Sequence, residues 1–486
     1  MKEYTPLISL WAQTIILLVY LIQRYRRPKF IRDLPGPRGY PLIGNYIDFP
    51  KSHPWLKFKE WGDTYGPIYQ LKVFGVTYVI INDAETAEEL LSERGFRYSG
   101  RSNFEMITMM TGGMDLAITA IKAKPCNGIC HQTDRRPSND YWRRGRKFAA
   151  SVLGSNMVPK WDPVQAREAT RMVVDMVCDP TRYQFWLERA STCASVRLTF
   201  GKNLPGAEEA EYHTQRITER MHEIERIAEN PPSFARFWSE KDDHYNLEWR
   251  EAAYVIATLH GGGSGTTLST MQSYCLAMCH FPEWQKRLHD EIEQVVGSER
   301  APNLDDIGNL PIVRAVSKEL LRWRPVVPIG IPHRVAFDDE YEGYRIPAGA
   351  LVVANQWGIH REKQLYPDGD EFDPERWLDM WYSSTYEHPT AKYPTIRRFS
   401  AFGIGRRICP GYDVAERALF IQIASLEWAC RIKKKKTVNG EEIALPLYEY
   451  SSGVTSQPLN FQFDVEPYEA RRVEVLKNAW EEAIDL

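Results

Sequence analysis

The stretch FSAFGIGRRICPGYDVAERALF, residues Phe399 to Phe420, decides the fold of this chain. It places Cys409 in a glycine-rich loop that runs directly into a segment with apolar residues at helical spacing. Glycine has no Cβ, so the loop glycines let the backbone approach a flat prosthetic group closely. Because the cysteine lies at the start of the predicted helix, free amides and the helix dipole favour its thiolate form. The stretch therefore predicts a thiolate held against a flat group.

Two other interpretations of Cys409 are a buried structural cysteine and a zinc ligand. A zinc site needs further cysteine or histidine ligands at recognisable spacing. The nearest candidates along the chain are His360, His388 and Cys430, and none stands at such a spacing. Both interpretations are therefore weak.

Length and composition bound the class of protein. The 486 residues, 43% of them apolar, are enough to bury a large core and favour a multi-lobed catalytic unit. The net charge of −3 gives no global attraction to nucleic acid, so we expect no nucleic-acid partner. The eight cysteines are scattered along the chain, which is typical of free thiols in a reducing compartment.

The N-terminal residues predict a membrane anchor. Leu7 to Ile22 is an uncharged, mostly apolar run that approaches the roughly 20 residues a helix needs to cross a bilayer. Arg24, Arg26, Arg27 and Lys29 follow it, so the positive-inside rule places the rest of the chain in the cytosol. A cleaved signal peptide and a helix lying in the membrane interface are the alternatives. A signal peptide would carry its positive charge before the apolar run, which this chain does not.

The remaining chain predicts a mainly α fold with minor β structure. Leu34 to Asn45 is rich in proline and glycine and reads as a stiff connector. Ile68–Leu71 and Tyr78–Ile81 predict a hairpin, most periodic segments between Ala84 and Cys430 predict helices, and Pro458–Val465 predicts a strand. The expected division is a membrane anchor (1–27), a connector (28–45) and one catalytic domain (46–486).

The cysteine loop also carries a resemblance to a known family. Phe402, Gly405, Arg407, Cys409 and Gly411 match the haem-binding signature Phe-x-x-Gly-x-Arg-x-Cys-x-Gly at every fixed position. The chain thus resembles the cytochrome P450 superfamily. The resemblance implies the cytochrome P450 fold, with haem between a long distal helix and the proximal cysteine loop and Cys409 as the axial iron ligand. A thiolate in that place favours cleavage of the O–O bond.

A second signal lies upstream, where Leu310 to Pro325 predicts a helix that begins at Pro311 and ends before Pro325. Glu319 and Arg322 lie three residues apart on one face of it. Taken alone, such a pair is usually a solvated ion pair of small energy. The resemblance implies instead that both residues, with Arg376 in FDPERW, form a buried structural network behind the haem.

Further residues acquire roles only through the resemblance. It implies that a set of side chains binds the cofactor, and an arginine fork suits the two oxygens of a propionate. The cofactor-binding set is Trp142, Arg146, Gly262, His333, Phe402, Arg407 and Gly411. A second set predicts a basic docking surface for an acidic reductase, or alternatively a solvated basic face. That set is Arg143, Arg144, Lys147, Arg397, Arg398 and Arg406.

The long apolar segment Trp249 to Phe281 is interrupted by HGGGSGTT, residues His260 to Thr267. Each of its four glycines costs a free helix about 1 kcal/mol, so the cluster needs a reason. A linker between two helices is one interpretation. The resemblance implies the other, a helix over the oxygen-binding face whose small residues make room for dioxygen.

In that second interpretation Thr266 supports proton delivery, with Thr267 behind it. The family usually has an acid directly before this threonine, and here the position is Gly265. We therefore expect an enzyme that transfers protons less efficiently and releases peroxide, with Ser264, Thr266 and water carrying the protons.

Two segments depart from the family pattern. Ala120 to Pro137 is irregular and looks inserted, and the region 205–248 is shorter than usual. Our hypothesis is an incorrect gene model, such as a retained intron and a skipped exon. A transcript identical to this sequence would refute it.

The function implied is a fungal secondary-metabolism monooxygenase acting on a hydrophobic terpenoid, polyketide or alkaloid. Electrons would come from NADPH through cytochrome P450 reductase, with the anchor in the endoplasmic reticulum membrane. Val327–Ile331 and Gly453–Thr455 are the candidate substrate-lining segments. The alternatives are a haem-thiolate isomerase or dehydratase, which needs no reductase, and a non-catalytic haem-binding pseudoenzyme, which shows no substrate-dependent spectral change.

Overall fold

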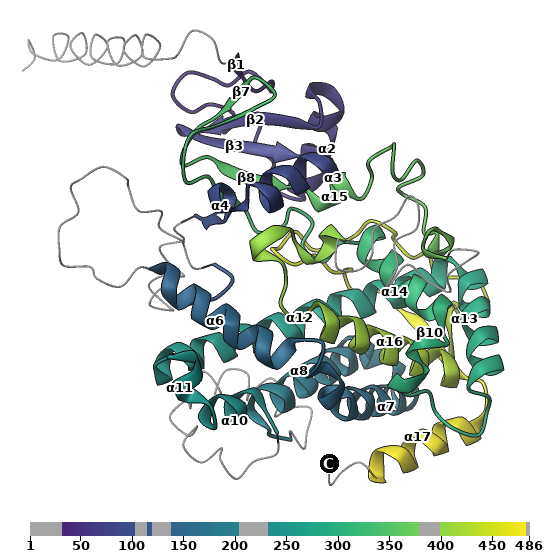
Figure 1. Ribbon diagram of the computed structural model, residues 1–486. Coiled ribbons are helices and arrows are strands. Elements are labelled where there is room, and N and C mark those ends of the chain that lie inside the picture. The colour runs from purple at the N-terminus through teal and green to yellow at the C-terminus, as the bar shows by residue number, and fades with distance from the viewer. Residues whose placement is uncertain (1–31, 103–113, 119–137, 204–231, 379–398, 483–486) are drawn as a thin grey trace, which may run out of the picture.

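The computed structural model describes residues 32–102, 114–118, 138–203, 232–378 and 399–482. Figure 1 shows most of the strands gathered with α2 (Pro54–Tyr65) at one end of the molecule, and the long helices, with β10 beside them, at the other. Most of the described residues with regular structure are helical, which confirms the predicted mainly α fold with minor β structure.

The sheet end contains a five-stranded sheet of order β2-β3-β8-β5-β4 and a three-stranded sheet of order β1-β7-β6. The predicted hairpin is confirmed, because β2 and β3 pair antiparallel with Ile68 opposite Ile81 and turn at Gly75, whose φ is +81°. The strands are β1 (Arg32–Asp33), β2 (Ile68–Val73), β3 (Val76–Ile81), β4 (Gly100–Arg101), β5 (His333–Arg334), β6 (Asp339–Tyr341), β7 (Tyr344–Ile346), β8 (Leu351–Ala354), β9 (Cys430–Lys434) and β10 (Phe463–Pro467).

Most elements described between Ala84 and Cys430 are helices, as predicted, and strands β5 to β8 within residues 333–354 are the main exception. β8 lies in the middle of the larger sheet, where Val352 and Val353 are both buried. A strand buried on both faces reads as a short continuous apolar run, which periodicity alone does not distinguish from a helix.

The helical end holds most of the hydrophobic core. Its centre is α12, which packs against α8, α16 and α6. The helices are α2 (Pro54–Tyr65), α3 (Ala84–Glu88), α4 (Gly95–Tyr98), α6 (Ser138–Leu153), α7 (Asp162–Cys178), α8 (Tyr183–Phe200), α10 (Phe234–Ser239), α11 (Asp242–Tyr245), α12 (Trp249–His280), α13 (Pro282–Val295), α14 (Pro311–Trp323), α15 (Gln356–Ile359), α16 (Tyr412–Ala429) and α17 (Ala470–Glu482).

The glycine cluster lies inside α12, which is one unbroken helix, so the interpretation as a linker is wrong. A capping box between Glu248 and Glu251 satisfies amides at its start. At Gly263 a Cβ would lie 3.3 Å from Ser195 Oγ of α8, so this glycine lets the two helices approach closely. The cost of glycine in a helix is thus offset by helix packing.

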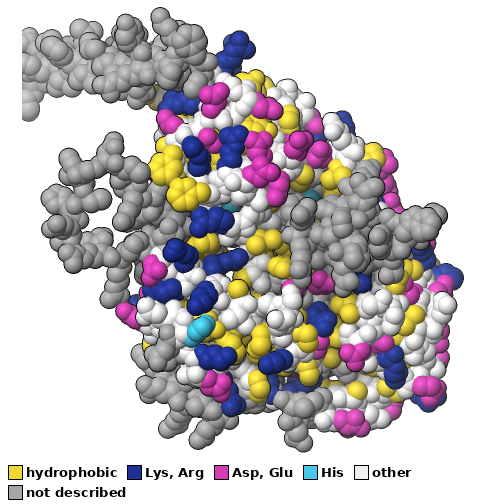
Figure 2. Space-filling model, viewed as in Figure 1, with side chains coloured by type: hydrophobic (Ala, Val, Ile, Leu, Met, Phe, Trp, Pro, Cys, Tyr) yellow, Lys and Arg dark blue, Asp and Glu magenta, His cyan; other side chains and the backbone are white. Residues whose placement is uncertain are grey.

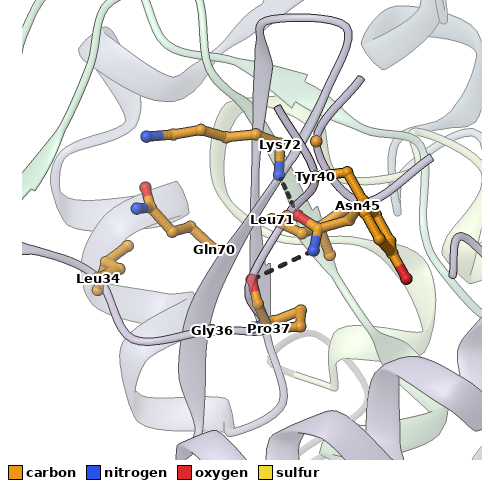
Figure 3. A pocket seen from close by; sticks show the side chains of 10 residues that line it. Leu34, Gly36, Pro37, Tyr40, Asn45, Gln70, Leu71 and Lys72 are labelled. Atoms are coloured by element: carbon orange, nitrogen blue, oxygen red, sulfur yellow. Dashed lines mark hydrogen bonds between the residues drawn. The ribbon is translucent and has the colours of Figure 1, made fainter. Parts of the chain in front are cut away.

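The connector from Leu34 to Asn45 is fixed along strand β2. The Gln70 amide donates to Pro35 O at 2.8 Å, and the Asn45 amide donates to Lys72 O at 2.6 Å. A Cβ at Gly36 would lie 1.9 Å from Gln70 O, so only glycine fits there. Figure 3 shows the shallow pocket between these segments, with the Asn45 side chain bonded to both of them.

The strand predicted near the C-terminus is confirmed in part, whereas the predicted anchor is not tested. The strand predicted at Pro458–Val465 begins later, since β10 runs from Phe463 to Pro467 and pairs antiparallel with β9. The predicted anchor, residues 1–27, and the irregular segment 120–137 both lie outside the described residues. Within the described part of the chain, no helix is long and apolar enough to cross a membrane.

A buried ion pair joins α14 to the segment that follows α15. Glu319 and Arg322 have no exposed side-chain surface, and Arg322 Nη2 lies 2.7 Å from Glu319 Oε1. The interpretation as a solvated pair is therefore wrong. Arg322 uses all five donors, two on Glu319 and the others on the carbonyl oxygens of His360, Gly369 and Glu371.

The carboxylate of Glu319 is equally occupied. It accepts from the Asp373 amide and from Trp377 Nε1, both at 2.9 Å, and Arg376 Nε lies 3.7 Å from it. The three charged residues that the sequence associates therefore meet in one buried group. The polar atoms of Glu319 and Arg322 are all hydrogen-bonded, as burial of charge requires, whereas Arg376 Nε makes no hydrogen bond.

We expect Arg322→Ala to lower the free energy of unfolding by about 3–5 kcal/mol, because Glu319 would stay buried without its partner. The matched control is Lys286→Ala, which removes an ion pair to Asp290 whose side chains are 75% and 58% exposed. Its effect should stay within about 0.5 kcal/mol. Chemical denaturation followed by circular dichroism measures both, and equal effects would contradict the role of the buried pair.

Candidate functional site

The cysteine loop lies between the two ends of the molecule. Ile404 packs into the apolar cluster of the sheet end, whereas Phe399 and Leu419, on either side of the loop, pack into that of the helical end. The Cys409 amide donates to Phe402 O at 2.7 Å and closes the loop. Figure 1 shows the start of α16 beneath the sheet end. The loop is thus fixed at three points before it enters the helix.

Backbone conformation explains why glycine stands at position 405. Its φ is +63°, and a Cβ would lie only 2.1 Å from Leu91 O. Any other residue would be strained and would collide with the backbone of the neighbouring turn. The signature glycine therefore seats the loop against the sheet end.

Cys409 retains accessible surface although protein surrounds it, so its thiol faces an internal space. Burial raises the pKa of the Cys409 thiol, while the Gly411 amide and the charge of Arg146 act against this rise. Burial in the chain alone therefore opposes the predicted thiolate, which needs a bound cation beside it. A bound cationic metal would deprotonate the thiol.

Two predicted cofactor residues on α6 face the cysteine loop. Trp142 is buried, its Nε1 has no hydrogen-bond partner, and the Arg407 guanidinium lies 4.6 Å from its ring centroid. Arg146 is close enough to Cys409 for each to influence the pKa of the other. The structure therefore brings Trp142, Arg146, Arg407 and Cys409 together.

The sheet end contributes two more groups. His333 is buried on β5, and its Nδ1 donates to Tyr98 O at 2.7 Å, which leaves Nε2 without the proton when the ring is neutral. Arg101 on β4 is 4% exposed and donates to Ile331 O at 2.5 Å and to Ala117 O at 3.1 Å. Burial, and then the charges of Arg101 and Arg407, lower the pKa of His333.

These cations fit the propionates of a haem. Burial lowers the pKa of Arg101 to about 10, and burial with neighbouring guanidinium groups lowers that of Arg407 to about 8. Among the described residues no carboxylate pairs with Arg101 or Arg146. Charges removed from water are normally paired, so Arg101 and Arg146 call for an anion. The two propionates of a haem would supply it, and the unpartnered Trp142 Nε1 is a further donor.

Helix α12 borders an open space with its glycine-rich face. A Cβ at Gly262 or Gly265 would meet no atom within 4 Å. Thr266 is half-buried and its Oγ1 donates to Gly262 O at 2.7 Å, whereas Thr267 is buried. The short segment 114–118 joins this helix to the cysteine loop, since Leu116 bonds both Thr258 Oγ1 and Arg407 Nη1.

The two candidate substrate-lining segments meet. The Ser456 amide, directly after Gly453–Thr455, donates to Val326 O at 2.8 Å, directly before Val327–Ile331. The side chain of Gln457 also lies 3.4 Å from Ser269 Oγ of α12. The segment that follows Gly453–Thr455 therefore contacts both the segment after α14 and helix α12. Its contact with α12 is at Ser269, three residues beyond Thr266.

Sequence reasoning missed two residues that matter to this site. Arg101 stands alone in YSGR, and nothing local shows that β4 buries it without a carboxylate. The sequence offers His360 only as a distant candidate zinc ligand, yet its side chain is hydrogen-bonded to Ser400 at the start of the cysteine loop. The apolar surroundings of both come from distant parts of the chain, so no local signal identifies them.

Comparisons with known proteins find relatives over most of the chain. The family model described as cytochrome P450 matches residues 34–123 and 165–447. A cytochrome P450 monooxygenase of Armillaria gallica is 31% identical over 96% of this chain and 95% of the relative, and the monooxygenase claR of Ampulloclitocybe clavipes is 30% identical over 97% and 92%. A zebra fish cytochrome P450 with abiraterone has the same fold, with a TM-score of 0.69, 22% identity and coverage of 86% of this chain and all of that one.

We expect Arg101→Leu to speed the loss of haem to a haem-scavenging protein by about tenfold, because it removes a buried charged donor while keeping the apolar volume. The matched control is Arg97→Leu, since Arg97 is 47% exposed and paired with Asp339. Absorbance in the Soret region follows haem transfer. Equal rates in the two variants would contradict the assignment of Arg101.

Proposed function

Since this chain belongs to the cytochrome P450 family, we propose that it inserts one oxygen atom from O2 into a hydrophobic small molecule, with Cys409 as the axial ligand of its haem. The family and fold imply a haem iron with a cysteine thiolate ligand, and the relatives are monooxygenases by name. The observation that carries the assignment to these residues is that the buried Arg101 and the half-buried Arg146, near the cysteine loop, pair with no carboxylate among the described residues.

When bound, the haem with its thiolate ligand supplies cleavage of the O–O bond. The chain supplies the surroundings. Arg101, Arg146 and Arg407 would hold the propionates, and Trp142 would add a donor from α6. His333 would join them once a neighbouring propionate raises its pKa and so protonates Nε2. Gly262 and Gly411 would leave room for the flat group, and Phe402 would pack against it. The network of Glu319, Arg322 and Arg376 holds the loop from behind and touches no substrate.

Proton delivery would depend on hydroxyl groups of α12. Thr266 Oγ1 and Ser264 Oγ both donate to backbone carbonyl oxygens of the same helix, and each has a lone pair left to accept from water. Gly265 adds no acid between them. Because a hydroxyl exchanges protons more slowly than a carboxylic acid near neutral pH, we expect imperfect coupling of electron use to product formation.

A reductase would dock on the face over α6. Figure 2 shows Lys and Arg side chains gathered there. Arg143, Lys147 and Arg406 are exposed, and Arg406 belongs to the cysteine loop. Arg144 is wrong as a member of this surface, because its side chain is 19% exposed and paired with Glu251. Arg397 and Arg398 lie outside the described residues. The three exposed charges that are described support an acidic flavoprotein partner that draws electrons from NADPH.

Membrane association in the endoplasmic reticulum would combine the predicted anchor with an exposed apolar surface at the sheet end. Leu42 and Phe74 are 76% and 61% exposed, and the ring of Tyr46 lies against that of Phe74 in a tilted arrangement, with centroids 4.7 Å apart. Leu42 and Phe74 also have positive φ, a backbone state that disfavours bulky residues. Exposed apolar side chains at such turns support contact with lipid. Failure of the full-length chain to float with phosphatidylcholine vesicles would overturn this.

The substrate class follows from the apolar segments near α12. Val327–Ile331 contains no charged residue, and a terpenoid, polyketide or alkaloid of fungal secondary metabolism suits such a lining. The test is turnover of a panel of these compounds under ¹⁸O2 with NADPH and a fungal reductase. We expect one ¹⁸O atom per product and no product without reductase. Reductase-independent conversion at unchanged mass would establish an isomerase instead.

Replacing Gly265 by aspartate should restore a proton donor beside Thr266. The new side chain fits, because a Cβ at Gly265 meets no atom within 4 Å. A positioned acid contributes roughly 100-fold or more to proton transfer, so we expect the share of NADPH lost as hydrogen peroxide to fall by about tenfold. Gly265→Asn, which has the same size and no acid, is the control. Unchanged peroxide release in Gly265→Asp would contradict the proton-delivery account.

A further inference from the structure

His360 joins the buried ion pair to the cysteine loop. It follows α15 and has no exposed surface. Its Nδ1 lies 3.2 Å from Arg322 O, and its Nε2 lies 3.0 Å from Ser400 Oγ. Ser400 begins the turn that leads through Phe402 to Cys409. One imidazole ring therefore touches both the ion-pair helix and the first residues of the loop.

The two contacts fix the state of the ring. A carbonyl oxygen only accepts hydrogen bonds, so Nδ1 carries the proton and donates to Arg322 O. Nε2 is then an acceptor, and the Ser400 hydroxyl donates to it. Burial and the charges of Arg322 and Arg361 keep the pKa of His360 well below its ordinary value, so the ring stays neutral. Both hydrogen bonds need this neutral form.

The backbone and the ring face are held as well. Arg322 Nη1 donates to His360 O at 2.9 Å, so the two residues bond each other in both directions. The imidazole stacks on Phe399, with centroids 4.8 Å apart and planes 21° apart. Phe399 and Ser400 are adjacent, so His360 restrains the loop entrance by stacking and by hydrogen bonding. The closing bond of the loop, from the Cys409 amide to Phe402 O, lies two residues further on.

We infer that His360 is a positioning residue that, through the Ser400 hydroxyl, keeps the cysteine loop in register with the Glu319–Arg322 pair and so holds Cys409 on the haem iron. This inference rests on the proposed role of Cys409 as axial ligand. His360 touches neither substrate nor the reacting atoms. Its action is to oppose movement of the loop away from the iron.

The test measures loss of the thiolate ligand in the full-length haem protein. Reduction under carbon monoxide gives a red-shifted Soret band with a thiolate ligand, and warming moves it to the histidine-like position as the thiolate is lost. We expect Ser400→Ala to speed this conversion by about fivefold to tenfold, the effect of one neutral hydrogen bond. Ser400→Thr keeps the hydroxyl and should stay within about twofold of the parent.

A matched control separates positioning from general stability. Ser191→Ala removes a buried hydroxyl that donates to Leu187 O on α8, remote from the loop. It should lower the unfolding temperature and leave the thiolate-loss rate below that temperature unchanged. Ser400→Ala should instead lose the thiolate before the helices unfold, as followed by circular dichroism. Equal behaviour of the two variants would overturn the inference.

A double-variant comparison tests whether Ser400 acts through His360. His360→Phe keeps the stack on Phe399 and removes both hydrogen bonds, so Ser400→Ala should add less than about twofold in that background. Effects that multiply, or a Ser400→Ala rate equal to the parent rate, would overturn the inference alone. A parent chain without the red-shifted band would overturn the proposed function, and this inference with it.

Discussion

The structure depends on a pair of opposite charges with no access to water. Glu319 and Arg322 would be costly to bury separately, and their attraction offsets that cost only because every donor of Arg322 is used. Three of the hydrogen bonds of Arg322 go to carbonyl oxygens of residues that follow α15. The pair therefore fixes α14 against a segment that lies about 40 to 50 residues downstream. Removing either partner would leave a charge without compensation. The region behind the cysteine loop is therefore rigid by necessity.

From this pair the order extends to the reactive thiol. His360 bonds Arg322 on one side and Ser400 on the other, and Ile404 and Gly405 seat the loop on the sheet end. The loop thus has a rigid frame on both sides. On the other side of the loop the charges are not paired, because Arg101 and Arg146 have no carboxylate partner among the described residues. The frame is complete by itself, while the space before the thiol calls for an anionic group.

The sequence predicted what depends on local chemistry. Proline at 311 and 325 marks the limits of α14, and the glycine turn at 75 marks the hairpin, because these residues act on their own backbone. The spacing around Cys409 predicted the loop and the following helix for the same reason. The network of Glu319, Arg322 and Arg376 needed the family resemblance, since spacing alone describes a solvated pair equally well.

What the sequence did not predict depends on distant contacts. Arg101 is buried by residues more than 200 positions away, and β8 reads as helix or strand until its partner β3 is known. The pKa of the Cys409 thiol is a similar case. The sequence shows the helix terminus, which favours the thiolate, but not the burial, which raises the pKa. The four glycines of α12 were ambiguous until α8 was seen against Gly263.

The central claim is that Cys409, held by this frame, binds the haem iron as a thiolate. The most direct measurement is the Soret difference spectrum of the reduced protein under carbon monoxide, recorded for the parent chain and for Cys409→Ala. A thiolate opposite carbon monoxide shifts the band strongly to the red. The account predicts that band in the parent and its disappearance in the variant. A parent with only the histidine-like band, or a variant that keeps the red-shifted one, would contradict it.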